Sequence, residues 1–144
     1  LDVTIQAQVL ALPAELKASD GMAMIFITHN LGVVASIADR VAVMYAGDIV
    51  ELAGVEELFA HPTHPYTEAL LRSIPRVDRD ALDLKPIPGQ VPPITAMPAG
   101  CRYADRCRLR IARCSVEVPP LVPVPGLSGH QARCWVRAPV AEAA

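Results

Sequence analysis

Four cysteines and one histidine are the residues whose types and positions could perform chemistry. The cysteines are spaced C-x5-C-x6-C-x19-C. This spacing lacks the C-x2-C element typical of zinc sites and the close run of bacterial ferredoxins, so it identifies no single metal. Ligation of a metal or cluster, disulfides and free thiols all stay open from the residues alone. The candidates are Cys101, Cys107, Cys114 and Cys134.

His29 is the other candidate, because it directly follows a short apolar run, MAMIFIT, at residues 22–28. Ligand sites in open α/β sheets gather at the carboxyl ends of strands. An imidazole there can donate a hydrogen bond to a phosphate oxygen, and the N-terminus of a helix beginning near Leu31 would add positive partial charge. A histidine that only ends the strand is the alternative, and both interpretations stay open.

The elements that would position this histidine are a strand and two helices. Val3–Ala18 has apolar residues at helical spacing, with a break expected just before Pro13 because proline lacks a backbone donor. The run at 22–28 is predicted to be a buried strand with parallel neighbours on both sides. Asn30 is expected to cap the helix that follows.

The next residues predict a hairpin and two short helices. RVAVMYAGDIVEL, residues 40–52, holds two β-rich runs around Ala46 and Gly47, and glycine tolerates the positive φ that tight turns require. The segments at 55–60 and 65–74 are predicted to be helical.

Beyond Ile74 the composition changes. Nine of the fourteen prolines lie between Pro86 and Pro125, so long helices and central strands are not expected there. All four cysteines lie in or just after this proline-rich segment. The sequence therefore indicates a loop-dominated half held together by covalent or metal staples.

Composition and charge exclude some classes of protein. Apolar residues make up 52% and charged residues 19% of the 144 residues, which is typical of a folded domain. No stretch reaches the roughly 18 to 20 apolar residues that a membrane-spanning helix requires. The net charge is −2, although residues 101–137 hold seven arginines against two acids. Nucleic-acid binding is disfavoured, because aromatic residues are few and the chain is not basic overall.

Three segments together resemble one protein family: LDVTIQAQVL at the start, GMAMIFITHNLGVVASIADRVAVMYAGDIVE from residue 21 and HPTHPYTEALLRSIP from residue 61. They are similar to the ATP-binding subunit of bacterial dipeptide and oligopeptide ABC importers. The resemblance implies an α/β fold, the carboxyl-terminal part of an ABC-type P-loop NTPase domain followed by an irregular Pro/Cys-rich extension. The implied domains are 1–75 for the ATPase part, 76–137 for the extension with the four-cysteine site, and 138–144 for a flexible tail.

The resemblance also implies roles for two residues. His29 resembles the switch histidine, which would contact the γ-phosphate of ATP and help position the attacking water. Asp2 resembles the end of the D-loop and would act across the interface of two nucleotide-binding domains. The complete subunit would bind ATP and Mg, pair with a second ATP-binding subunit and drive integral membrane permease subunits. It would be peripheral, at the cytoplasmic face of the bacterial inner membrane; the exact cargo stays open.

Several motifs of that family are missing. No G-x-x-x-x-G-K-[ST] occurs in the sequence, although ATP hydrolysis requires a phosphate-binding loop and a carboxylate-held Mg²⁺. The signature loop and the catalytic glutamate are missing too, and Asn30 stands where the family usually has aspartate. We therefore expect a carboxyl-terminal fragment, inactive by itself, of a subunit that powers peptide import. A non-enzymatic interaction module stabilised by a metal or cluster is the alternative.

Some members of this family hold a [4Fe-4S] cluster on four cysteines of the extension, matched here by PGQVPP, GCRYADRC and GHQARCW. The resemblance assigns the four cysteines of this chain to such a site, although Arg108 stands where proline commonly follows the second cysteine. Five arginines would either stabilise an anionic cluster or form a solvated basic face. They are Arg102, Arg106, Arg108, Arg110 and Arg113.

Three further residues have secondary assignments. His64 is interpreted as part of a proline-bounded helix start. His130 is a candidate substitute ligand, because imidazole also binds iron and zinc. Trp135, beside the last cysteine, is expected to shield the site.

Overall fold

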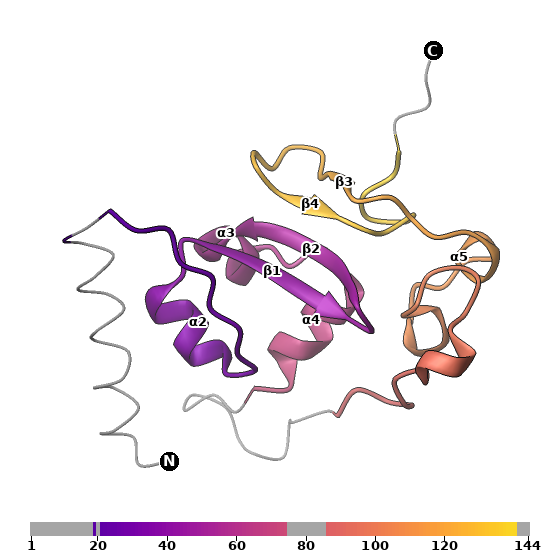
Figure 1. Cartoon of the computed structure of the whole chain (residues 1–144). Helices are drawn as coiled ribbons and strands as arrows, with labels where there is room; N and C mark the ends of the chain where they lie inside the picture. Colours follow the sequence, from indigo (N-terminus) through magenta and orange to yellow (C-terminus); the bar gives the residue numbers. More distant parts are fainter. Residues whose placement is uncertain (1–18, 20, 75–85, 141–144) are drawn as a thin grey trace. The chain divides into compact units, whose positions relative to one another are not determined.

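The computed structural model describes residues 19, 21–74 and 86–140 (Figure 1). The chain divides into two compact units, Leu1–Asp39 and Arg40–Ala144. The predicted helix Val3–Ala18 lies outside the described residues.

In the first unit, α2 (Leu31–Ile37) begins as the sequence predicts. The Asn30 side-chain oxygen accepts hydrogen bonds from the backbone N–H groups of Gly32 and Val33, at 3.0 and 3.4 Å. These bonds satisfy donors that a helix N-terminus otherwise leaves unpaired. The predicted helix and its cap are confirmed.

The predicted strand at residues 22–28 does not form. The segment has no regular secondary structure, and Ile25 and Ile27 are 92% and 94% exposed. A buried strand needs neighbours that pair with its N–H and C=O groups and cover its side chains. No described strand pairs with this run. The prediction is wrong for this structure, because an apolar sequence supplies strand propensity but not the partner.

In the second unit, β1 (Arg40–Tyr45) and β2 (Asp48–Gly54) form the predicted antiparallel hairpin. Ala46 and Gly47 at the turn have φ values of 48° and 89°. Two consecutive positive φ values are what a two-residue hairpin turn requires, so the glycine fits its position. The hairpin prediction is confirmed.

Two short strands of the proline-rich half extend the hairpin into a sheet. β4 (Gln131–Ala132) pairs with β2, and β3 (Val122–Pro123) pairs with β4, which gives the order β1-β2-β4-β3. Val124 and Ala138 are buried with Ala132 in a small apolar cluster. The structure is therefore a small α/β fold whose described strands pair only in antiparallel fashion. Backbone hydrogen bonds tie its irregular half to the hairpin.

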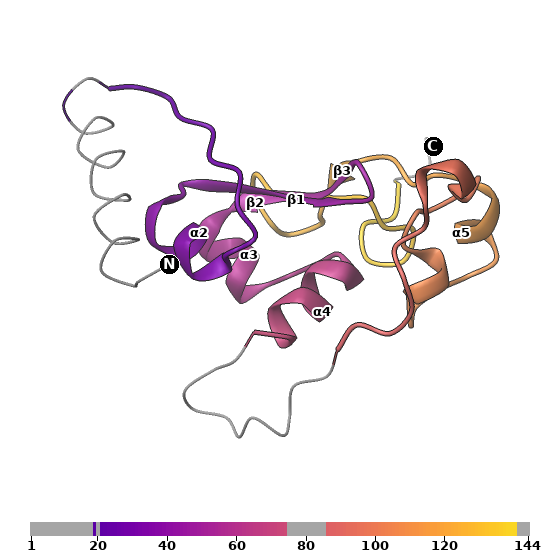
Figure 2. The same cartoon turned by 60° about the horizontal axis from the view of Figure 1, so that its bottom comes forward.

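Two helices follow the hairpin in sequence. α3 (Val55–Ala60) packs against β1 and β2 and buries Leu58 completely. α4 (Pro65–Arg72) begins with proline in its first turn, where a missing N–H costs nothing. Figure 2 shows both helices on the same side of the hairpin. Both predicted helices are confirmed.

The rest of residues 86–140 consists of loops with single helical turns. These are the 3₁₀ turns Ile94–Ala96 and Ala104–Arg106 and the short helix α5 (Arg113–Val116). The prediction of a loop-dominated half is confirmed for this range. Among all described residues, no helix combines the length and apolar character needed to cross a membrane.

Candidate functional site

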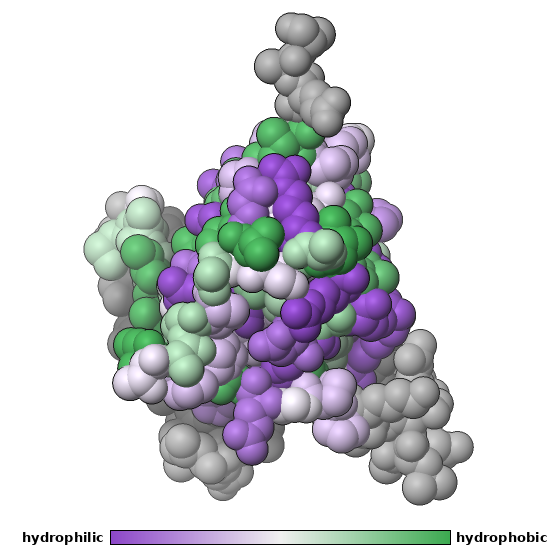
Figure 3. Space-filling view, turned by 90° about the vertical axis from the view of Figure 1, so that its right-hand side faces the viewer, coloured by the Kyte–Doolittle hydropathy of each residue, from purple (hydrophilic) through white to green (hydrophobic). Residues whose placement is uncertain are grey.

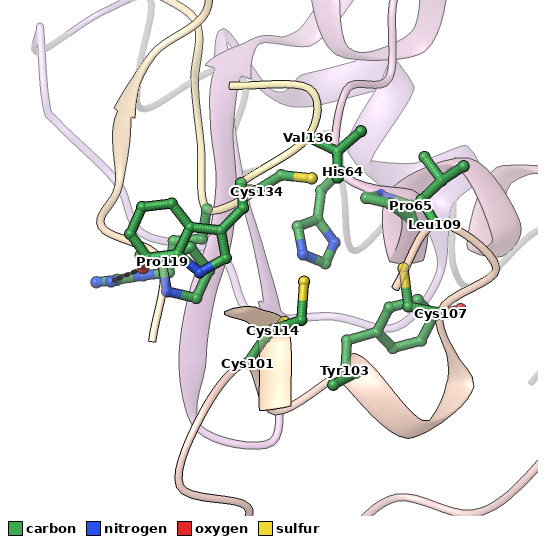
Figure 4. Close-up of a pocket in the computed structure, with 13 residues that line it drawn as sticks. His64, Pro65, Cys101, Tyr103, Cys107, Leu109, Cys114, Pro119, Cys134 and Val136 are labelled. Carbon is green, nitrogen blue, oxygen red and sulfur yellow. Dashed lines mark hydrogen bonds between the residues drawn. The ribbon is translucent and has the colours of Figure 1, made fainter. Parts of the chain in front are cut away.

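The four cysteines line one pocket of the second unit (Figure 4). The pocket is small and partly open to solvent, and all four thiols are free. Cys114 and Cys134 are buried, whereas Cys101 and Cys107 are half-buried. The structure thus brings together four residues that the sequence spacing alone could not assign to one site.

Close backbone packing positions the first and third cysteines. The N–H of Cys101 donates to the carbonyl oxygen of Cys114 at 2.9 Å. Gly100 makes this approach possible, because a Cβ at that position would lie 2.3 Å from the same oxygen. The 3₁₀ turn that starts at Ala104 then leads from Cys101 to Cys107. A residue without a side chain is therefore required beside the site.

Backbone N–H groups are directed at three of the four sulfurs. The Tyr103 backbone donates to Cys101, and the Leu109 backbone donates to Cys107. The N–H of Arg137 lies 3.4 Å from the sulfur of Cys134. Such bonds favour a thiolate over a neutral thiol, and hydrogen bonds to ligand sulfurs also tune metal centres.

Burial opposes ionisation of the half-buried thiols. Desolvation raises the pKa of Cys101 to about 11, helped by the nearby Cys114 and Cys107 thiols, and the backbone bond from Tyr103 only partly offsets this. Desolvation also raises the pKa of Cys107. Without a bound cation these two thiols are therefore neutral at pH 7, and a cation in the pocket would be needed to hold them as thiolates.

His64 forms part of the pocket wall and is also the N-cap of α4. Its Nδ1 accepts a hydrogen bond from the N–H of Tyr66 at 3.1 Å, which confirms the predicted role at the helix start. Burial and the charge of Arg137 lower the pKa of His64 to about 4. The imidazole is therefore neutral at pH 7 and faces the cysteines (Figure 4).

His130 has a different role from the one predicted. Its Nε2 lies 2.6 Å from Oε1 of Glu51, and both side chains are fully buried. Glu51 also accepts hydrogen bonds from the backbone N–H groups of Thr63 and His64, at 2.7 and 2.9 Å. His130 is not among the residues that line the pocket. This histidine therefore fastens the segment before Cys134 to β2 instead of reaching the thiols.

The five arginines near the cysteines are engaged in ion pairs and hydrogen bonds. Hydrophilic and apolar side chains alternate over the face that carries α5 (Figure 3). The partners are Asp48 for Arg102, Glu68 for Arg108, Asp105 for Arg110, Glu117 for Arg113, and the carbonyl oxygens of Ile87 and Pro88 for Arg106. These arginines anchor loops, which neither predicted role anticipated.

Trp135 lies in the pocket wall, as expected for a shielding residue. The guanidinium of Arg113 lies 3.6 Å from the centre of its ring. The indole N–H also donates to the carbonyl oxygen of Glu117 at 3.1 Å. The ring is therefore held in place on two sides.

The arrangement differs from a closed cage for one ion. Within residues 21–74 and 86–140, no three or more His, Cys, Asp or Glu side chains form a group that could hold a metal ion. A single zinc ion would need each sulfur about 2.3 Å away. The four thiols line a pocket without contracting to that geometry.

The two residues assigned to nucleotide chemistry, His29 and Asp2, do not belong to the cysteine pocket. His29 is exposed and belongs to the first unit, between Thr28 and the capping Asn30. Because Asn30 already occupies the first N–H groups of α2, the imidazole itself would have to supply the donor to a phosphate. Asp2 lies outside the described residues.

Sequence reasoning missed three residues that organise the cysteine pocket: Glu51, Glu68 and Gly100. The two acids lie in β2 and α4, and the residues that they bind near the cysteines, His130, Arg108 and Arg137, are distant in sequence. Only the glycine had a signal available, since it directly precedes a cysteine in GCRYADRC. A glycine there is compatible with close backbone approach.

A family model described as the oligopeptide/dipeptide transporter C-terminal region matches residues 50–114 of the chain. This range extends from β2 to the third cysteine. It therefore covers most of β2, the helices α3 and α4, and three of the four cysteines.

Individual proteins match over nearly the whole chain. A Brucella ovis protein whose name describes a peptide import ATP-binding protein is 51% identical over 141 residues, which is 93% of this chain and 41% of that protein. The oligopeptide transport ATP-binding protein of Bacillus subtilis is 47% identical over 94% of the chain and 41% of its own length. The dipeptide transport ATP-binding protein of the same organism is 45% identical over 95% of the chain and 40% of its length.

These similarities confirm the resemblance to ATP-binding subunits of dipeptide and oligopeptide ABC importers. The chain spans about two fifths of the length of these relatives, 40 to 41%. Nothing in the comparisons supports the alternative of a free-standing interaction module.

Proposed function

We propose that this chain is the carboxyl-terminal part of an ATP-hydrolysing subunit that powers import of dipeptides or oligopeptides through an ABC transporter. The observation that carries the proposal is the 45 to 51% identity to peptide-transport ATP-binding proteins over at least 93% of the chain. The complete subunit would bind ATP and Mg, dimerise with a second ATP-binding subunit and act on membrane permease subunits at the cytoplasmic face of the inner membrane.

In this proposal residues 1–75 complete a P-loop ATPase domain of the ABC type, residues 76–137 form the extension with the four-cysteine site, and 138–144 a tail. His29 would donate a hydrogen bond to the γ-phosphate and position the attacking water. Its exposure supports this role, because a donor to a ligand must be accessible. Asp2 would couple the two nucleotide-binding domains across their interface.

The nucleotide proposal is tested in the complete subunit by replacing His29 with alanine. A group that positions or polarises a reacting water contributes about 10²–10⁴ in rate, so ATP turnover should fall by that factor. His61→Ala is the matched control, because this histidine is exposed and its side chain lies 2.7 Å from Glu57, at the end of α3. Undiminished turnover after His29→Ala would overturn the role, and ATP turnover by the 144-residue chain alone would contradict its proposed incompleteness.

We also propose that the four cysteines hold a [4Fe-4S] cluster. The residues fit such a group in three respects: four thiols line one pocket, backbone N–H groups point at three sulfurs, and the wall is largely apolar. Four thiolates complete the ligation of such a cluster, which supplies a redox-active or structural centre when bound.

The cluster proposal is tested on the full chain purified without oxygen. Visible absorption together with about four iron and four sulfide per chain is the expected result for this cluster type. Cys114→Ser should abolish the absorption, whereas Ser115→Ala, its neighbour, should preserve it. A colourless protein that contains zinc would overturn the proposal.

A further inference from the structure

Glu68 of α4 is surrounded by three arginines. Its carboxylate oxygens lie 2.6 Å from Arg108, 2.8 Å from Arg137 and 2.5 Å from Arg72. The Glu68 side chain is only 13% exposed. Burial alone would raise its pKa, but the hydrogen bond from Arg108 and the charges of Arg137 and Arg72 lower it below the ordinary value. Glu68 is therefore ionised at neutral pH.

Two of these arginines adjoin cysteines of the pocket. Arg108 directly follows Cys107 in the chain. Arg137 lies three residues after Cys134, and its backbone N–H is the group 3.4 Å from that sulfur. The third, Arg72, lies four residues along α4 and pairs with Glu68 within the helix. One carboxylate thus holds the chain beside two ligands that are distant in sequence.

The other two cysteines are held independently of Glu68. Cys101 and Cys114 are joined by their own backbone hydrogen bond of 2.9 Å. Arg102, next to Cys101, pairs with Asp48 at 2.9 Å. Arg113, next to Cys114, pairs with Glu117 at 2.5 Å. Figure 4 shows Cys101 and Cys114 beside each other, with Cys107 and Cys134 nearer the start of α4.

We propose that Glu68 is a positioning residue of the four-cysteine site, which fixes the Cys107 and Cys134 segments on α4 through Arg108 and Arg137. The carboxylate sets how accessible these two sulfurs are and keeps the N–H of Arg137 directed at Cys134. This inference concerns the thiols themselves and holds whether or not they carry a cluster. Only its consequence for iron retention rests on the proposed cluster.

The test is alkylation of the full, reduced, metal-free chain, with the modification of each cysteine followed by mass spectrometry. In Glu68→Gln, Cys107 and Cys134 should react several-fold faster than in the unchanged chain, whereas the rates at Cys101 and Cys114 stay the same. Glu117→Gln is the matched control, because it removes a carboxylate from an ion pair beside Cys114 and leaves Arg108 and Arg137 in place.

A general loss of folding would accelerate all four cysteines together, so the pattern separates positioning from stability. If Glu68→Gln does not fold, two variants of its arginine partners provide the test instead. Arg108→Gln should accelerate Cys107 alone, and Arg137→Gln should accelerate Cys134 alone. The inference would be overturned if these variants accelerated all four cysteines by the same factor. It would also be overturned if folded Glu68→Gln left the rates at Cys107 and Cys134 unchanged.

A second measurement addresses the loaded site. After anaerobic reconstitution with ferrous iron and sulfide, release of iron to a chelator should be several-fold faster from Glu68→Gln than from Glu117→Gln. Failure of the unchanged chain to bind iron would overturn the cluster proposal but leave the alkylation pattern to decide the role of Glu68. Equal iron release from both variants, with no selective alkylation, would overturn the positioning role alone.

Discussion

Two segments differ in burial from what their local sequence predicts: residues 22–28 are more exposed, and residues 100–138 are more buried. The first segment has an apolar β pattern, yet Ile25 is 92% exposed. The second is rich in proline and poor in regular structure, yet it buries Ala132 completely and His130 to 1% exposure. The second segment has long-range partners in β2 and α4. Burial in this chain therefore follows the partners that a segment finds, more than its local propensity.

Of the changes considered, replacing Glu51 should have the largest effect on the burial of residues 100–138. Alanine would leave the N–H groups of Thr63 and His64 and the Nε2 of His130 without their buried acceptor. Each buried donor left without its acceptor costs about 1–3 kcal/mol, so the free energy of unfolding should fall by at least roughly 3 kcal/mol. Chemical denaturation of the full chain measures it, with the exposed Glu56→Ala as control. An unchanged midpoint would show that Glu51 does not fasten the segment around His130 to β2.

Acidification should weaken the same region through His64. Burial and the charge of Arg137 lower its pKa from 6.5 to about 4, so on acidification the unfolded chain takes up a proton before the folded chain does. Stability that is present above pH 6.5 is therefore lost between pH 6.5 and 4, by roughly 3 kcal/mol at about 1.4 kcal/mol per pH unit.

His64→Asn is the matched variant for this pH dependence. Asparagine keeps an oxygen that can cap α4 but does not titrate, so its unfolding free energy should vary less between pH 7 and 5. The lowered pKa of Glu68 places its titration below this range. An identical slope in both proteins would exclude His64 as the cause.

Gly100→Ala should disturb the cysteine pocket itself. The added Cβ would lie 2.3 Å from the Cys114 carbonyl oxygen and 2.8 Å from the Ser115 carbonyl carbon, and both are backbone atoms. Overpacking of this kind costs about 1–3 kcal/mol. Cys101 and Cys114 should also alkylate faster as their backbone bond is lost. Gly126→Ala is the control, because its added Cβ would meet nothing within 4 Å and only its φ of 81° would be strained. Faster alkylation of Cys101 and Cys114 in this control as well would show that the clash at Gly100 is not the cause.

Sequence patterns predicted the elements that depend on near neighbours. The turn at Ala46 and Gly47, the cap at Asn30 and the start of α4 at Pro65 each follow from one or two residues with defined backbone preferences. The pocket could be anticipated only as a set of cysteines. Its positioning depends on Glu51 and Glu68, whose partners lie up to 79 residues away in the chain, and no local pattern encodes such pairs.

The smallest effect in this chain should come from Ile25→Ser. The side chain is 92% exposed, so the free energy of unfolding of the full chain should change by less than about 0.5 kcal/mol. In the complete subunit proposed above, where residues 22–28 would pair as a buried strand, the same change should cost roughly 2–5 kcal/mol. Denaturation of both proteins measures the difference, which is the stabilisation that strand neighbours add. A small cost in both would contradict the proposed strand, and a large cost in the chain alone would mean that this segment already buries its apolar face.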